Sequence, residues 1–139
     1  MTYKKGVFKL EITFKGGCRE VGRSGLLING EVLLDYGIKA GDPAEYPLNS
    51  MEPKTVLVSH GHLDHCGAVP NLMYLDPEVY MTPPTAEFTS LLGQIPSNSR
   101  RPHFRVPPFD PEDFQKLRRM TQKKNWGDFQ NQWLQSLLL

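Results

Sequence analysis

Cysteine is scarce in this chain of 139 residues, which holds only Cys18 and Cys66. Two cysteines are too few for the disulfide framework of a small secreted domain, so we expect both to be reduced thiols. Cys66 directly follows a histidine, but adjacent side chains at a helix start point in different directions. We therefore interpret Cys66 as a small buried residue rather than a metal ligand.

Long apolar runs and an excess of one charge are also missing. No stretch approaches the roughly 20 apolar residues of a membrane span, and no signal-peptide segment follows Lys4 and Lys5. The sequence thus predicts no membrane partner, and a cytoplasmic setting is the default. A net charge of +1 says little about partners. Basic residues gather after residue 99 and could contact nucleic acid. Such a charge run is more often a solvated helix face, and we favour that interpretation.

What the chain does have is a cluster of histidines. Residues 59–65 read Ser-His-Gly-His-Leu-Asp-His and follow the apolar residues 55–58, which are typical of a buried strand. Residues 64–72 should open a helix. The junction of a strand and a following helix is where α/β sheets bind ligands.

The chemistry of this stretch is that of a metal site, because neutral imidazole and carboxylate groups hold zinc and similar divalent ions. His60 and His62 can reach one ion from an irregular loop, and Gly61 removes bulk where the backbone bends. Asp64 and His65 could reach a second ion about 3.5–4 Å away, as in two-metal hydrolases. Any one of these histidines alone would be an ordinary loop residue; together they predict metal binding.

The flanking sequence predicts a mixed α/β fold. Alternation over residues 7–14 places Phe8, Leu10, Ile12 and Phe14 on the buried face of a half-buried strand. The next strands, 25–28 and 31–35, are joined by an Asn-Gly hairpin turn and should be antiparallel neighbours. Strands and helices then alternate, which indicates a parallel portion of the sheet with helices packed on it.

Two later helices are expected. One begins at Thr82 and Pro83, with an apolar stripe of Phe88, Leu91 and Leu92. The other begins at residues 110–113, where acidic residues favour a helix N-terminus. Its apolar face is made by Phe114, Leu117 and Met120.

Asp35 ends the third predicted strand. It could cap a turn, or it could lie near the histidines and orient a ligand. The spacing does not choose between the two.

Residues 59–67 resemble the His-x-His-x-Asp-His signature of the metallo-β-lactamase superfamily. Residues 16–24, 33–37 and 82–85 resemble the N-terminal region of β-CASP RNA-processing nucleases, and in particular archaeal homologues of the cleavage and polyadenylation specificity factor nuclease subunit. The resemblance covers roughly residues 7–123. It implies the N-terminal part of an αββα sandwich, in which helices pack on a mixed sheet.

The resemblance further implies a zinc-dependent hydrolase that cleaves RNA. His60 and His62 would ligate one ion, and Asp64 and His65 the other. Asp64 would be the catalytic residue beside the attacking water, and Asp35 a supporting aspartate beside the metals. The domain division expected from it is a partial metallo-β-lactamase-like domain over residues 1–124, followed by a divergent amphipathic tail, residues 125–139.

The match is incomplete. The family's further ligands lie downstream of the matched region, and His103 does not correspond to one. We therefore expect one or weakly bound zinc ions in place of two, and little or no nuclease activity for this chain alone. Arg19 and Arg23 are candidates for RNA contact, although surface or ion-pair roles are commoner.

Two alternatives remain. One is another metallo-β-lactamase-fold hydrolase, acting on a thioester or a lactam. The other is a non-catalytic metal-binding or interaction fragment whose apolar tail packs on a partner, a second copy or its own chain. The tail residues concerned are Trp126, Phe129, Trp133, Leu134, Leu137 and Leu138.

Overall fold

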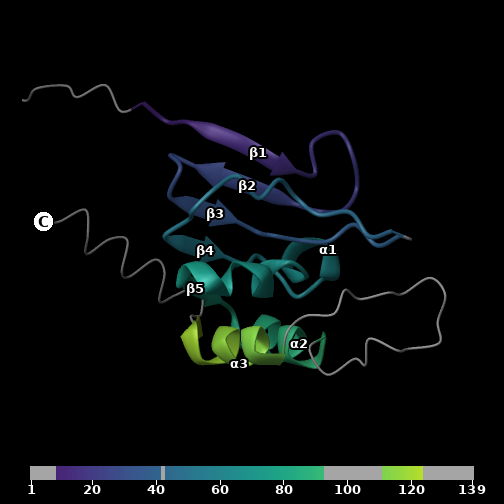
Figure 1. Cartoon of the computed structure of the whole chain (residues 1–139), viewed down its shortest axis with the longest axis vertical. Helices are drawn as coiled ribbons and strands as arrows, with labels where there is room; N and C mark the ends of the chain where they lie inside the picture. The colour runs from purple at the N-terminus through teal and green to yellow at the C-terminus, as the bar shows by residue number, and fades with distance from the viewer. Residues whose placement is uncertain (1–8, 42, 93–110, 124–139) are drawn as a thin grey trace, which may run out of the picture.

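A six-stranded mixed sheet forms the centre of the protein. The computed structural model describes residues 9–41, 43–92 and 111–123. The strands lie side by side in chain order, and Figure 1 shows them from β1 at the top to β5. The first three are antiparallel neighbours and β3 to β6 are parallel, which confirms the predicted fold class. The strands are β1 (Ile12–Gly16), β2 (Gly25–Ile28), β3 (Val32–Leu34), β4 (Thr55–Leu57), β5 (Glu78–Met81) and β6 (Thr121–Lys123).

The predicted hairpin joins β2 to β3. Asn29 and Gly30 both adopt left-handed backbone angles, with φ of 50° and 73°. Two such residues in succession make the tight turn whose twist matches that of the flanking strands. The turn sets the register, in which Ile28 pairs with Val32 and Leu26 with Leu34.

Four helical segments pack beside the sheet: α1 (Leu63–Cys66), the 3₁₀ helix η1 (Val69–Leu75), α2 (Pro83–Leu92) and α3 (Pro111–Met120). The single helix expected over residues 64–72 is thus wrong, and two short segments replace it. Pro70 explains the break, because a proline ring has no N–H for the preceding turn and collides with it. Among the described residues, no helix has the length and apolar character to cross a membrane.

One face of the sheet carries the core. The register aligns Leu27, Leu33, Val56 and Val79 across β2 to β5, and none of them is more than 7% exposed. Helical residues pack against this row in one hydrophobic cluster. They include Val69, Leu72 and Met73 of η1, as predicted, Ala86 of α2 and Leu117 of α3.

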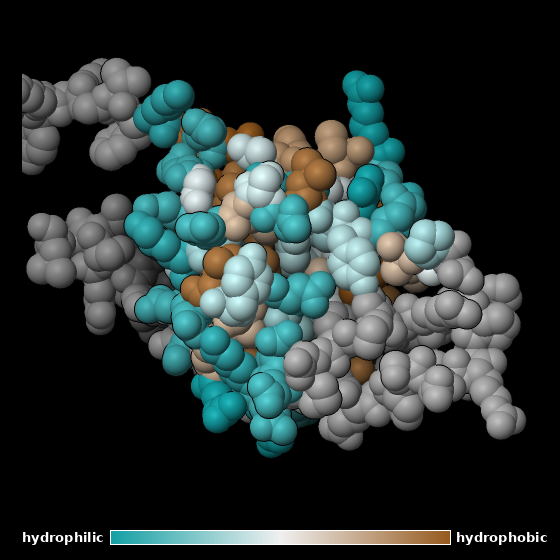
Figure 2. Space-filling view, in the orientation of Figure 1, coloured by the Kyte–Doolittle hydropathy of each residue, from teal (hydrophilic) through white to brown (hydrophobic). Residues whose placement is uncertain are grey.

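The opposite face of the sheet is open as far as the described residues go, and the prediction that the apolar face of β1 is buried was wrong. Leu10, Ile12 and Phe14 are 65%, 47% and 59% exposed, and Phe8 lies outside the described residues. Ile12 and Phe14 pair with Ile28 and Leu26, on the side away from Leu27 and the helices. Figure 2 shows apolar atoms at the surface along the top of the view, where β1 lies.

The apolar stripe expected on α2 was wrong for two of its three residues. Phe88 and Leu91 are 61% and 57% exposed, while Leu92 packs against the core, and Thr85 and Thr89 are buried. The Thr89 hydroxyl donates a 2.8 Å hydrogen bond to the Thr85 carbonyl, which removes most of the cost of burying it. Small side chains on this face let α2 approach the sheet closely. Strand β6 was not predicted either, because it is short and follows α3 directly.

The two faces should differ in their contribution to stability. Leu33→Ala removes a fully buried side chain from the core row, and we expect it to lower the free energy of unfolding by about 2–5 kcal/mol. Leu10→Ala removes the same atoms from an exposed site and should cost under about 1 kcal/mol. Urea unfolding measures both; equal losses would contradict the assignment of the faces.

Candidate metal centre

The predicted ligands lie where the parallel strands β3 and β4 end. Asp35 follows β3 directly, and residues 58–62 connect β4 to α1. His62 is the N-cap of α1, with extended backbone angles (φ −71°, ψ 146°). The motif thus occupies the junction of a strand and a helix that the sequence predicted.

The structure brings the four predicted ligands together. The ring centroid of His60 lies 4.0 Å from that of His65 and 4.6 Å from that of His62. Nε2 of His65 lies 3.5 Å from Oδ2 of Asp64, close enough for both atoms to face one ion. The side chains of Asp64 and His65 are 36% and 28% exposed, so solvent reaches this edge.

Asp35 lies beside this cluster and contacts it. Its Oδ2 lies 2.8 Å from Nδ1 of His65 and accepts a 2.8 Å hydrogen bond from the Ser59 hydroxyl. Its Oδ1 accepts a 2.7 Å hydrogen bond from the backbone N–H of Ser59. Asp35 thus contacts two residues of the motif, and its role in orienting a ligand stays a prediction.

The donor types suit a divalent ion. Imidazole nitrogen and carboxylate oxygen are the usual zinc donors. Over the described ranges, no group of three or more His, Cys, Asp or Glu side chains is arranged to hold a metal ion. The expected division of the ligands, His60 with His62 and Asp64 with His65, stays a prediction.

Cys66 is not one of these donors. It is fully buried, as expected, and burial raises the pKa of its thiol to about 11. A buried thiol that keeps its proton at neutral pH is a packing residue, since the thiolate is the form that binds metals.

The backbone after β3 holds α1 in place. Backbone N–H groups around residues 24 and 36–38 donate to three carbonyls of α1, and the Leu63 carbonyl also accepts a 2.9 Å hydrogen bond from Gly67 N. Gly37 permits this approach, because a Cβ there would lie 1.7 Å from the Asp64 carbonyl oxygen. The hydrogen bonds run from Tyr36 N to His65 O (2.8 Å), from Ile38 N to Leu63 O (3.0 Å) and from Ser24 N to Asp64 O (2.9 Å).

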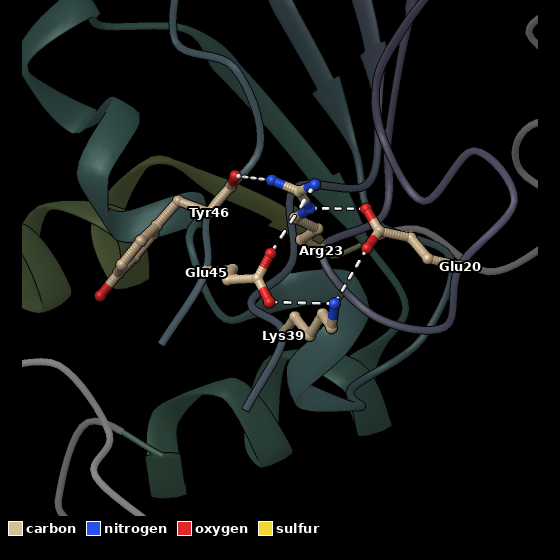
Figure 3. A network of polar contacts seen from close by, with 5 residues as sticks. All are labelled: Glu20, Arg23, Lys39, Glu45 and Tyr46. Carbon is tan, nitrogen blue, oxygen red and sulfur yellow. Dashed lines mark hydrogen bonds and ion pairs between the residues drawn. The ribbon is translucent and has the colours of Figure 1, made fainter. Parts of the chain in front are cut away.

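A network of four charged side chains anchors the loop that carries Ser24 (Figure 3). Glu20 accepts hydrogen bonds from Nε of Arg23 (2.6 Å) and Nζ of Lys39 (3.0 Å). Glu45 completes the ring through Lys39 (2.9 Å) and Arg23 (3.8 Å). The hydrogen bond from Arg23 lowers the pKa of Glu20, and the one from Lys39 lowers it further.

The two arginines proposed to contact RNA differ in their surroundings. The guanidinium of Arg23 already pairs with Glu20 and Glu45 and donates to the Tyr46 carbonyl, so it has a structural role. Arg19 is exposed and makes no polar contact in the described part of the chain. The ion-pair role that the sequence made the commoner expectation is found for Arg23, but Lys39 and Glu45 could not be named from sequence because they are distant along the chain.

A comparison with known protein families agrees with the site. The model of the metallo-beta-lactamase superfamily matches residues 24–122, which include every candidate ligand. This chain belongs to the metallo-β-lactamase superfamily. The resemblance seen in the motif is thereby confirmed at the level of the superfamily.

Several relatives of this superfamily member carry names from RNA metabolism. A transcription termination factor FttA of Pyrococcus horikoshii is 30% identical over 149 aligned residues, which cover 91% of this chain and 23% of the relative. The Methanosarcina mazei factor of that name is 39% identical over 98 residues (60% and 15%). An RNase J-like protein of Methanocaldococcus jannaschii is 41% identical over 80 residues (55% and 18%). The chain spans less than a quarter of the length of these relatives.

Gly37 should be required for the contact between the chain after β3 and α1. In Gly37→Ala, the new methyl group would push against the Asp64 carbonyl, and we expect a loss of about 1–3 kcal/mol of stability. The amides of Tyr36 and Ser24 should lose protection from hydrogen exchange. Leu10→Ala, at a residue that is 65% exposed, should leave that protection unchanged. Full protection in Gly37→Ala would contradict the close approach.

The charge network should make stability depend on pH. The pKa of Glu20 is below its ordinary value of 4.5, so its contribution is present above that pH and disappears as pH falls through the lower, folded-state pKa. The melting-temperature difference between the wild type and Glu20→Gln should therefore vanish on acidification below 4.5. Glu52→Gln, at an exposed residue without an ion pair in the described chain, serves as the control. A difference that grows in acid would contradict this role.

Proposed function

We propose that this chain is part of a zinc-dependent hydrolase that cleaves the phosphodiester bonds of RNA, of the β-CASP nuclease type. The observation that carries the proposal is the meeting of His60, His62, Asp64 and His65 at one edge of the sheet, with Asp35 behind them. Three imidazoles favour zinc over magnesium, which prefers oxygen ligands.

Each residue of the proposed centre would have its own role. His60 and His62 would hold one ion, and Asp64 and His65 a second. A bound divalent ion would supply Lewis acidity, which lowers the pKa of water and stabilises charge on a phosphoryl oxygen. The partly exposed carboxylate of Asp64 can accept a hydrogen bond from the attacking water and orient it.

RNA as the substrate is supported by the relatives, whose names refer to transcription termination and to RNase activity. Arg19 is the better candidate for a phosphate contact, because its guanidinium is exposed and unpaired within the described ranges. A thioester or lactam substrate has no such support among these relatives.

A second candidate is an interaction fragment, and the open face of the sheet favours it. Ile12 and Phe14 form part of an apolar surface that a partner could cover. Association through the tail, residues 125–139, stays a prediction, because that segment lies outside the described residues. A cytoplasmic setting stays a prediction too.

Zinc binding and RNA cleavage test the proposal directly. We expect the chain to bind zinc weakly, measured by mass spectrometry and competition with a chelator, because no three donors in the described residues are arranged around one ion. The double variant His60→Ala and His62→Ala should lose at least about 10-fold in affinity, whereas His103→Ala should not. Cleavage of single-stranded RNA by this chain alone should be weak.

Two outcomes would count against this reading. Robust RNA cleavage that EDTA abolishes would contradict the incomplete ligand set. Zinc binding no better than that of the double variant would contradict the metal centre, and a dimer by light scattering would then favour the interaction fragment.

A further inference from the structure

We propose that Ser59 is a positioning residue that extends the effect of Asp35 to His60, so that one carboxylate sets the ring tautomers of two histidines. The inference rests on the proposed metal centre for its purpose and on four hydrogen bonds around Asp35 and Ser59 for its geometry. It assigns a task to a serine that is not a ligand and that the motif alone does not explain.

The donors around Asp35 fix the tautomer of His65. A carboxylate has no proton to give, so each of its hydrogen bonds must be donated by the partner. Nδ1 of His65, 2.8 Å from Oδ2 of Asp35, must therefore carry the ring proton. The lone pair is then on Nε2, the atom that lies 3.5 Å from the Asp64 carboxylate and faces the proposed ion.

The hydrogen bonds of Ser59 assign the tautomer of His60 in the same way. The Ser59 hydroxyl has one proton and donates it to Oδ2 of Asp35 at 2.8 Å. Toward Nδ1 of His60, 2.9 Å away, the hydroxyl oxygen can only accept. Nδ1 of His60 must then be protonated, and its Nε2 is left free to bind an ion.

The geometry around Ser59 supports this relay. The backbone N–H of Ser59 donates to Oδ1 of Asp35 at 2.7 Å, so the residue is held to the carboxylate at two points. Ser59 is itself exposed, and its hydroxyl therefore needs no partner for the sake of burial. The exposed Ser59 hydroxyl lies between Oδ2 of Asp35 and Nδ1 of His60, a position from which it can orient the His60 ring.

His62 provides an internal comparison. In the part of the chain that the structure describes, the ring of His62 has no hydrogen-bond partner. The relay therefore predicts two histidines with a fixed tautomer and one whose tautomer follows solvent. Hydrogen bonds of this kind to a metal-binding histidine typically change metal affinity by about 10–100-fold.

Nuclear magnetic resonance of ¹⁵N-labelled histidine tests the relay on the metal-free full chain at alkaline pH. We expect His60 and His65 to be protonated at Nδ1 in the wild type. In Ser59→Ala, His60 should shift toward protonation at Nε2, while His65 keeps its tautomer. Ser59→Thr retains the hydroxyl and should restore the wild-type pattern. Ser50→Ala, at an exposed loop serine, is the matched control.

Zinc affinity provides the second measurement. Ser59→Ala should bind zinc about 10-fold more weakly than the wild type, and Ser59→Thr and Ser50→Ala should match the wild type. If Ser59→Ala does not fold, Ser59→Cys replaces it, since a thiol is only a weak acceptor and should give the same shift at His60.

The outcomes separate the relay from the proposed function. An unchanged tautomer of His60 in Ser59→Ala overturns the relay, whether or not zinc binds. Loss of zinc affinity that Ser59→Thr does not restore also counts against it, because the hydroxyl would then not be the cause. A wild type with the expected tautomers and no zinc binding would overturn the metal centre and leave the relay in place.

Discussion

The carboxylate of Asp35 is the interaction on which the candidate site depends. It is only 8% exposed, and burying a charge is costly unless hydrogen bonds compensate it. Three donors do so here: the backbone and hydroxyl of Ser59, and the ring of His65. These contacts join the end of β3 to the end of β4 and to α1. The same group thus stabilises the corner of the fold and contacts one of its histidines directly.

Successive parts of the chain support this corner. The backbone after β3 pairs with the carbonyls of α1, and Gly37 lets the two segments touch. The loop that holds Ser24 is in turn anchored by Glu20, Arg23, Lys39 and Glu45 (Figure 3). The basic side chains of Arg23 and Lys39 pair with the acidic side chains of Glu20 and Glu45, so these two basic groups are not free to bind nucleic acid. The position of the candidate ligands on α1 therefore depends on segments that carry no candidate ligand.

The site also adjoins the open face of the sheet. A hollow of about 350 Å³ on that face is lined by Leu34, Leu57 and Tyr80, and Asp35 and Ser59 form its rim. The core on the other face is complete within the described residues, since its central row is almost fully buried. The chain thus combines a buried core on one face of the sheet with an apolar surface on the other.

Features that depend on neighbouring residues could be predicted from the amino-acid sequence. They are the histidine motif, the Asn29-Gly30 turn, the order of the first five strands along the chain and the starts of α2 and α3. The packing of distant segments was needed to show which side of β1 is covered, that Phe88 is exposed, and that Asp35 reaches Ser59 and His65. Periodicity shows that a strand has an apolar face, but burial depends on what packs against it from elsewhere in the chain.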